Sequence, residues 1–134
     1  MACGREFVLD ERLKRRRLEK RTGEGVLGAC LRGGVEKFQV LTTMPHSSVG
    51  KAANVVGIGS AGLVDVSRGV EDLRFDMRRL EELLADESAA SVVVISCGEV
   101  NTGMFATHSR EEVLAIRELC DRYGAWLHVD GGKC

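Results

Sequence analysis

The run SVVVIS at residues 91–96 is the feature that most limits how this chain can fold. It is a continuous β-branched stretch with no alternation of polar and apolar residues, which is typical of a strand buried on both faces of a parallel sheet. Parallel strands need crossover connections, which are usually helices. The run therefore predicts an α/β fold with a mostly parallel sheet and right-handed crossovers.

Helical and strand-like patterns alternate along the rest of the chain, separated by many of its 16 glycines. The periodicity predicts helices over 2–21, 47–57 and 77–87 and after Ser109, strands over 38–43, 63–67, 91–96 and 125–129, and a glycine-rich loop over 22–36. No repeat is present, and 134 residues suit a single domain.

Two of the predicted helices carry recognisable end signals. Asp76 stands where an N-cap residue is expected for the helix over 77–87. Ser109 and Glu112 have the S-x-x-E spacing of a capping box, and Gly124 follows the last residue of the same apolar stripe. These two helices should therefore begin close to residues 77 and 110.

Charge and aromatic content argue against a nucleic-acid partner. The formal net charge is −1 and aromatic residues make up 4% of the chain. The basic run RLKRRRLEKR at 12–21 is interleaved or flanked by Asp10, Glu11 and Glu19. We interpret it as a solvated helix face rather than a nucleic-acid site.

The cysteines and the hydropathy pattern indicate a reducing, soluble compartment, and we expect a cytoplasmic protein. The chain has an odd number of widely spaced cysteines, namely Cys3, Cys30, Cys97, Cys120 and Cys134. Neither a disulfide framework nor a metal site is expected from these spacings. No apolar run approaches the roughly 20 residues needed to cross a bilayer, so no membrane partner is expected.

Three segments directly follow predicted strands, where ligands bind in sheets of this class. They are MPHSS at 44–48, CGEVNTG at 97–103 and DGG at 130–132. They bring together His46, Asn101, Thr102 and Asp130 as candidate site residues. Each also has a plain alternative, because such residues often form turns or caps. In the last strand His128 shares a direction with Asp130, one layer deeper, and is expected to be a core histidine.

A G-x-G-x-x-G pattern at Gly57, Gly59 and Gly62 raises the alternative of a nucleotide-binding domain. Such a site needs a strand before the glycines and a helix after them, so that the helix N-terminus can hold the phosphate. Here a predicted helix precedes the glycines and a predicted strand follows them. The order is reversed, which argues against a dinucleotide site.

Three motifs in order resemble those of the pyridoxal 5′-phosphate (PLP)-dependent group II amino-acid decarboxylases. The motifs are PHSSVGKAA, GEVNTGMF and YGAWLHVDGG, and the opening ACGREFVLDERLKRR resembles the helix after the family's phosphate loop. The resemblance covers essentially the whole chain. It implies part of a three-layer αβα large domain of the aspartate-aminotransferase-like fold.

The resemblance also implies roles for the four candidate residues. His46 would stack on the pyridine ring and Asp130 would pair with the protonated pyridine nitrogen, while Asn101 and Thr102 would line the pocket. The parent reaction would be loss of carbon dioxide from an L-amino acid joined to PLP as an aldimine. The family is homodimeric. The chain departs from the family pattern at Gly132, where alanine is usual, and at Ala106 and Thr107, where Asp-Pro is usual.

The resemblance also identifies parts of the family that residues 1–134 are not expected to supply. The family's Schiff-base lysine would lie beyond Cys134 and its phosphate loop before Met1, and the small C-terminal domain would be absent. Neither Lys51 nor Lys133 matches that lysine. We therefore expect a large-domain fragment with no catalytic residue of its own and no activity alone. An alternative is a non-catalytic interaction module that pairs with a full-length relative, since the family's fold normally dimerises. A sheet cut through its middle would also leave an unpaired edge at 125–129, which predicts aggregation or reliance on a partner.

Overall fold

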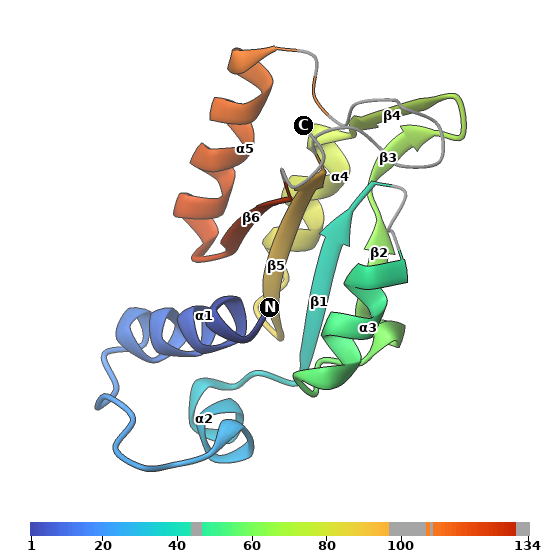
Figure 1. Ribbon diagram of the computed structural model, residues 1–134. Coiled ribbons are helices and arrows are strands. Elements are labelled where there is room, and N and C mark those ends of the chain that lie inside the picture. Colours follow the sequence, from blue (N-terminus) through green and yellow to red (C-terminus); the bar gives the residue numbers. More distant parts are fainter. Residues whose placement is uncertain (44–46, 97–106, 108, 131–134) are drawn as a thin grey trace.

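A four-stranded parallel sheet with the strand order β2-β1-β5-β6 forms the centre of the molecule (Figure 1). The computed structural model describes residues 1–43, 47–96, 107 and 109–130. The strands are β1 (Lys37–Thr42), β2 (Leu63–Asp65), β5 (Ala89–Ser96) and β6 (Trp126–Asp130). Every neighbouring pair runs parallel. The predicted α/β class and parallel sheet are confirmed.

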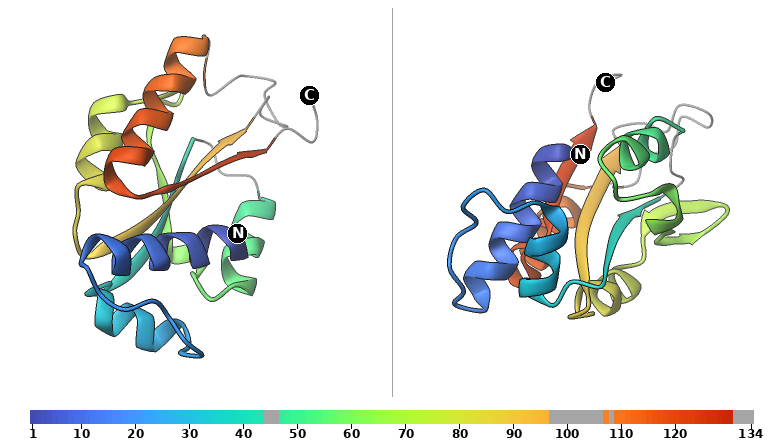
Figure 2. Two further views of the ribbon diagram at one scale, coloured as in Figure 1. Left: turned by 90° about the vertical axis from the view of Figure 1, so that its left-hand side faces the viewer. Right: turned by 90° about the horizontal axis from the view of Figure 1, so that it is seen from below.

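Helices cover both faces of this sheet and make three layers (Figure 2). The helices α4 (Met77–Leu84) and α5 (Arg110–Tyr123) lie on one face. The helices α1 (Ala2–Arg15), α2 (Val26–Gly33) and α3 (Ser47–Val55) lie on the other. Since both faces are covered, the central strand must be apolar on both sides.

The β-branched run at 91–96 supplies the middle of the core, as predicted. Val93 and Ile95 pack with Leu80 of α4 and Ile116 of α5. Val92 and the next residue on the same face, Val94, pack toward α3 instead. The side chains alternate because successive residues of a strand point to opposite faces. Burial from both sides explains why the run shows no polar alternation.

The predicted loop at 22–36 is wrong, because it contains the helix α2. Gly25 and Gly34 stand at the two ends of this helix, and Gly34 adopts a left-handed conformation with φ 66°. Ala29 is fully buried against Leu9 and Leu13 of α1. Glycine is common at helix ends. The glycines of this segment therefore mark the two ends of a short helix and not a continuous loop.

Two other predicted boundaries differ from the structure. The first helix ends at Arg15 rather than residue 21, since Arg17 turns into a left-handed conformation with φ 56°. The predicted strand over 63–67 ends at Asp65 and is followed by an antiparallel hairpin of β3 (Ser67–Gly69) and β4 (Asp72–Phe75). A left-handed residue or a tight hairpin hardly changes the spacing of apolar residues, so the apolar pattern did not predict where these two elements end.

The predicted helix caps are confirmed. The Asp76 carboxylate accepts a hydrogen bond from the Arg79 backbone N–H at 3.2 Å. The Ser109 hydroxyl accepts one from the Glu112 backbone N–H at 3.2 Å. Gly124 ends α5 in a left-handed conformation with φ 71°. In the part of the chain that the structure describes, no helix combines the length and apolarity needed to cross a bilayer.

Candidate functional site

The carboxyl ends of β1, β5 and β6 meet at one edge of the sheet, at the top of Figure 1. Val40 of β1 pairs in register with Val92 of β5, and Ser96 at the end of β5 pairs with Asp130 at the end of β6. The three segments singled out in the sequence therefore all follow strands that end at this carboxyl edge. Parallel sheets of this class bind their ligands at such an edge.

Asp130 is the predicted site residue that the structure describes. It is the last residue of β6 and its side chain is exposed. His46, Asn101 and Thr102 lie outside the described residues, and so do the departures at Ala106 and Gly132. The structure thus confirms the shared edge and the position of Asp130, while the arrangement of the four side chains stays a prediction.

The alternation of side chains along β6 places Asp130 on the face covered by α1 and α3. The Trp126 ring packs against Phe7 of α1, with 5.3 Å between the ring centroids. Leu127 packs in the cluster under α4 and α5 instead. Asp130 lies two pleats beyond Trp126 and points to the same face.

The prediction that His128 is a core histidine is wrong. His128 is exposed, and so are Val129 and Asp130. The reason is that β6 lies at the edge of the sheet among the described residues, and the packing of α1 reaches only the start of this strand. The predicted open edge at 125–129 is confirmed, with Val129 51% exposed.

Three polar residues at the ends of strands were missed as neighbours of the candidate site. Thr42 and Thr43 at the end of β1 are 1% and 4% exposed, and Ser96 at the end of β5 is half-buried. Two adjacent threonines directly after an apolar strand could have indicated them. Buried hydroxyl groups need hydrogen-bond partners, so these residues add donors and acceptors to the carboxyl edge.

The G-x-G-x-x-G pattern lies at the other end of the sheet. As predicted, α3 precedes these glycines and β2 follows them. Gly57 and Gly59 have φ values of 79° and 85°. A Cβ atom at position 62 would lie 2.8 Å from the backbone oxygen of Phe38. The pattern therefore serves a tight connection and a close approach to β1.

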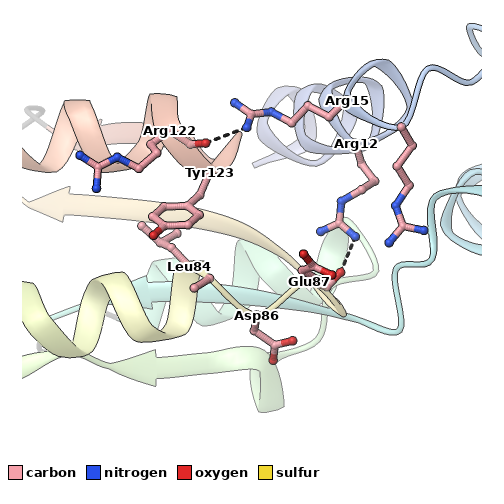
Figure 3. Close-up of a pocket in the computed structure, with 9 residues that line it drawn as sticks. Arg12, Arg15, Leu84, Asp86, Glu87, Arg122 and Tyr123 are labelled. Atoms are coloured by element: carbon pink, nitrogen blue, oxygen red, sulfur yellow. Dashed lines mark hydrogen bonds between the residues drawn. The ribbon is translucent and has the colours of Figure 1, made fainter.

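A hollow of about 310 Å³ lies between α1, α4 and α5 at the amino ends of the strands (Figure 3). Four arginines line it, and two of them reach across from α1. Arg12 donates to the backbone oxygens of Glu87 and Ala89, the latter at 2.8 Å. Arg15 donates to the backbone oxygens of Asp121 at 2.6 Å and Arg122 at 2.7 Å.

Arg12 also donates to the Gly33 backbone oxygen at 3.3 Å. These contacts form a structural connection, which we call the arginine joint: Arg12, Arg15 and their five acceptor carbonyls. Helix ends and turns leave carbonyls without intrahelical partners, and the two guanidinium groups satisfy them. Burial, with a contribution from Arg16, lowers the pKa of the Arg12 guanidinium. The interpretation of the run at 12–21 as a solvated helix face is therefore wrong for Arg12, which is half-buried, while Arg15 is exposed but also bonds to the protein. Their donors are occupied by the protein itself.

Comparison with known proteins gives matches in sequence. No protein-family model matches the chain. Tryptophan decarboxylase 1 of Oryza sativa subsp. japonica is 32% identical over 87 residues, which are 63% of this chain and 16% of that protein. L-2,4-diaminobutyrate decarboxylase of Acinetobacter baumannii is 31% identical over 85 residues, with the same shares.

Solved structures share the fold over nearly the whole chain. The crystal structure of Oryza sativa TDC with PLP and tryptamine matches with a TM-score of 0.66 and 24% identity, over 97% of this chain and 25% of that chain. Mouse CSAD matches with a TM-score of 0.59 and 22% identity, over 97% and 26%. Catharanthus roseus tryptophan decarboxylase in complex with L-tryptophan matches with a TM-score of 0.62 and 16% identity, over 97% and 26%.

The chain thus aligns with 16% of the length of its sequence relatives and with about a quarter of the solved structures. The four-stranded parallel sheet and its flanking helices match part of the large domain of those proteins. Together with the three ordered motifs, these matches show that the chain is similar to part of the PLP-dependent group II amino-acid decarboxylases.

Proposed function

We propose that residues 1–134 are part of the large domain of a PLP-dependent L-amino-acid decarboxylase, a carboxy-lyase, and that the carboxyl edge is part of its cofactor pocket. The observation that carries this proposal is the position of Asp130. Its carboxylate stands at the end of β6, beside Ser96, at the edge from which the loops after β1 and β5 also start. The matched structure of Oryza sativa TDC contains PLP, which supports the choice of cofactor.

The residues of the carboxyl edge suit this cofactor chemically. An exposed carboxylate is accessible to a ligand and can accept a hydrogen bond from a protonated pyridine nitrogen. A negative charge beside that nitrogen raises its pKa and keeps the proton there. When bound, PLP supplies an electron sink for the charge left when carbon dioxide departs. In this proposal Asp130 holds the proton on the ring nitrogen, His46 covers one ring face, and Asn101 and Thr102 contact its substituents.

The proposed substrate class is L-amino acids, because the sequence relatives are named for tryptophan and L-2,4-diaminobutyrate. The proposal assigns no catalytic lysine to these 134 residues. It therefore predicts that PLP binds to this chain without a covalent bond and that the chain alone releases no carbon dioxide.

Equilibrium dialysis of the purified chain against PLP tests the cofactor proposal. We expect saturable binding, and we expect Asp130→Asn to weaken it about tenfold, since an amide lacks the negative charge that pairs with the pyridinium nitrogen. Asp121→Asn is the matched control, because Asp121 is an exposed aspartate on α5. Equal affinities for the two variants, or no saturable binding to the unmodified chain, would contradict the proposal.

Two further measurements test the prediction that these 134 residues contain no catalytic lysine. Borohydride treatment followed by dialysis should leave no PLP on the chain. Incubation with carboxyl-labelled L-tryptophan or L-2,4-diaminobutyrate should release no labelled carbon dioxide. Covalent retention of PLP together with release of label would show that a lysine within these residues does the chemistry.

The open edge of β6 favours a second candidate function, pairing with a full-length relative. An edge strand has unpaired backbone groups, and Val129 adds an exposed apolar side chain to this edge. Co-expression with a tagged full-length decarboxylase tests this function. Stable co-purification would support it, whereas an unassociated monomer would argue against it.

A further inference from the structure

We propose that a hollow beside α1 is a docking site for an acidic peptide segment that inserts one apolar side chain. The hollow has a volume of about 560 Å³ and lies between the outer side of α1 and the turn that follows this helix. We call it the α1 hollow. Its apolar floor is Phe7, Leu13 and Leu18, and its basic rim is Lys14, Arg17 and Lys20.

The apolar floor is partly exposed and is held in place by the backbone. Phe7 is 37% exposed and Leu18 is 40% exposed. The Leu18 backbone N–H donates to the Leu13 oxygen at 2.9 Å, and the Arg17 backbone N–H donates to the Lys14 oxygen at 3.0 Å. This pair of bonds is the Schellman arrangement of a helix end. The wall of the hollow is therefore formed before any partner binds.

The charge of the α1 hollow is unbalanced. Its lining contains two acidic residues and four basic ones, namely Asp10 and Glu11 against Lys14, Arg17, Lys20 and Arg21. The acidic side chains of the hollow are already paired, since Asp10 contacts Arg21 at 2.8 Å and Glu11 contacts Arg15 at 3.3 Å.

The basic rim, in contrast, has few acidic partners. The Lys14 side chain is 82% exposed and reaches Glu11 at 3.7 Å. Arg17 and Lys20 make no ion pair within the described ranges. Apart from the contact between Lys14 and Glu11, the rim thus presents positive charge that no acidic side chain in the described ranges pairs with. Carboxylates of a partner would complement it.

The backbone at Arg17 supports a role for this side chain. Arg17 is the one residue other than glycine with a positive φ in the described part of the chain. Glycine is the usual residue at this position of a helix end, because a side chain there is strained. Arginine at this position places a guanidinium beside the hollow, which the usual glycine would not.

The shape of the hollow favours a peptide over a membrane or a nucleic acid. Its apolar residues line a concave hollow, which suits one inserted side chain better than the flat surface of a bilayer. Nucleic-acid bases would need an open aromatic face, but the Phe7 ring already packs against Trp126. A single inserted side chain fits both the floor and the charged rim.

The α1 hollow is separate from the proposed cofactor pocket. Figure 1 shows α1 beside the lower half of the sheet, while the strands end at the top. Loss of PLP binding would therefore leave this proposal unaffected.

Fluorescence anisotropy with labelled synthetic peptides tests the docking proposal. The probe is a short peptide of Asp and Glu around one central Phe, and its controls are the same peptide with Ala for Phe and a version with Lys for the acidic residues. We expect the probe to bind, with affinity falling as salt rises, and each control to bind at least about fivefold more weakly. Equal binding of the three peptides would overturn the proposal.

Arg17→Gly is the decisive variant, because it separates binding from stability. Glycine relieves the backbone strain, so the thermal midpoint should rise, while the affinity for the probe should fall about fivefold. Arg78→Ala, which removes an 89% exposed arginine on α4, should leave the affinity unchanged. Unchanged affinity in Arg17→Gly would overturn the proposal, as would binding of phosphatidylserine vesicles or an oligonucleotide in preference to the probe.

Discussion

The two ends of the sheet differ in how their polar groups are used. At the amino ends of the strands, the arginine joint ties α1 to the start of β5 and to the end of α5. At the carboxyl ends, β6 stops at an exposed aspartate, and β5 stops at a half-buried serine. One end uses its charged groups for internal contacts, whereas the other exposes a carboxylate. We therefore expect substitutions at the amino ends to change stability more than substitutions at the carboxyl edge.

Glycines are what allow the arginine joint to form. A Cβ atom at position 33 would lie 2.9 Å from the Arg12 side chain. At position 124 it would lie 2.8 Å from the Arg15 side chain. Each arginine stem therefore crosses a helix end that has no side chain. The candidate site residues all pointed to the carboxyl edge, whereas these close contacts between glycine and arginine lie at the amino end.

Among the substitutions that compare the two ends of the sheet, Arg12→Met is expected to lower the free energy of unfolding the most. Methionine keeps the apolar stem but leaves the carbonyls of Gly33, Glu87 and Ala89 without their charged donor. Hydrogen bonds from charged donors suggest a loss of about 2 kcal/mol in the free energy of unfolding. Urea denaturation followed by circular dichroism would measure it.

The control for this variant is Arg78→Met, which removes an exposed arginine paired with Glu82. Its effect should stay within about 0.5 kcal/mol, as is usual for exposed ion pairs on a helix. If both variants lose the same stability, the arginine joint is no more than an ordinary set of surface contacts.

A smaller loss in the free energy of unfolding is expected at high pH, from the buried thiol of Cys120 in the core beneath α5. Burial raises the pKa of the Cys120 thiol to about 11. The thiol of an unfolded chain ionises at lower pH, so the stability that depends on the protonated thiol is present below about pH 9 and is lost between about pH 9 and 11. Between pH 8 and 10 this loss should be on the order of 1 kcal/mol.

Urea titrations of the unmodified chain and of Cys120→Ala at several pH values would measure this loss. The alanine variant should show a flatter decline above pH 8, whatever its stability at neutral pH. Parallel declines in the two proteins would mean that the thiol is accessible to water in the native state.

The smallest effect is expected at the carboxyl edge. Asp130→Asn should change the free energy of unfolding by less than about 0.5 kcal/mol, because the side chain is exposed at the end of an edge strand. The same urea assay would measure it. A loss close to that of Arg12→Met would show that Asp130 stabilises the fold, and the contrast between the two ends would disappear.

Local patterns predicted the parts of the fold that depend on near neighbours. The caps at Asp76 and Ser109 and the strand at 91–96 were predicted correctly because each depends on a few adjacent residues. The helix α2 was missed because its glycines were interpreted as a loop. His128 was misplaced because the position of β6 in the sheet depends on strand pairing, which periodicity alone does not reveal.

The candidate site also has one part that local patterns predicted and one part that depends on strand pairing. Asp130 could be placed at a strand end from sequence, since alternation and the following glycines mark it. The nearby Thr42 and Ser96 could not be connected with it, because they lie on other strands. The arginine joint gave no local signal, and the basic run at 12–21 favoured a solvated face.

By itself the sequence determined the alternation of strands and helices, the helix caps and the motifs that relate the chain to the decarboxylases, since all of these are short-range patterns. Only the tertiary structure decided which arginines are used internally and which line the α1 hollow. Four of the five backbone oxygens to which Arg12 and Arg15 donate are 75 to 107 residues away in the chain. Contacts over such distances depend on the completed packing of α1 against the sheet, and no local pattern encodes them.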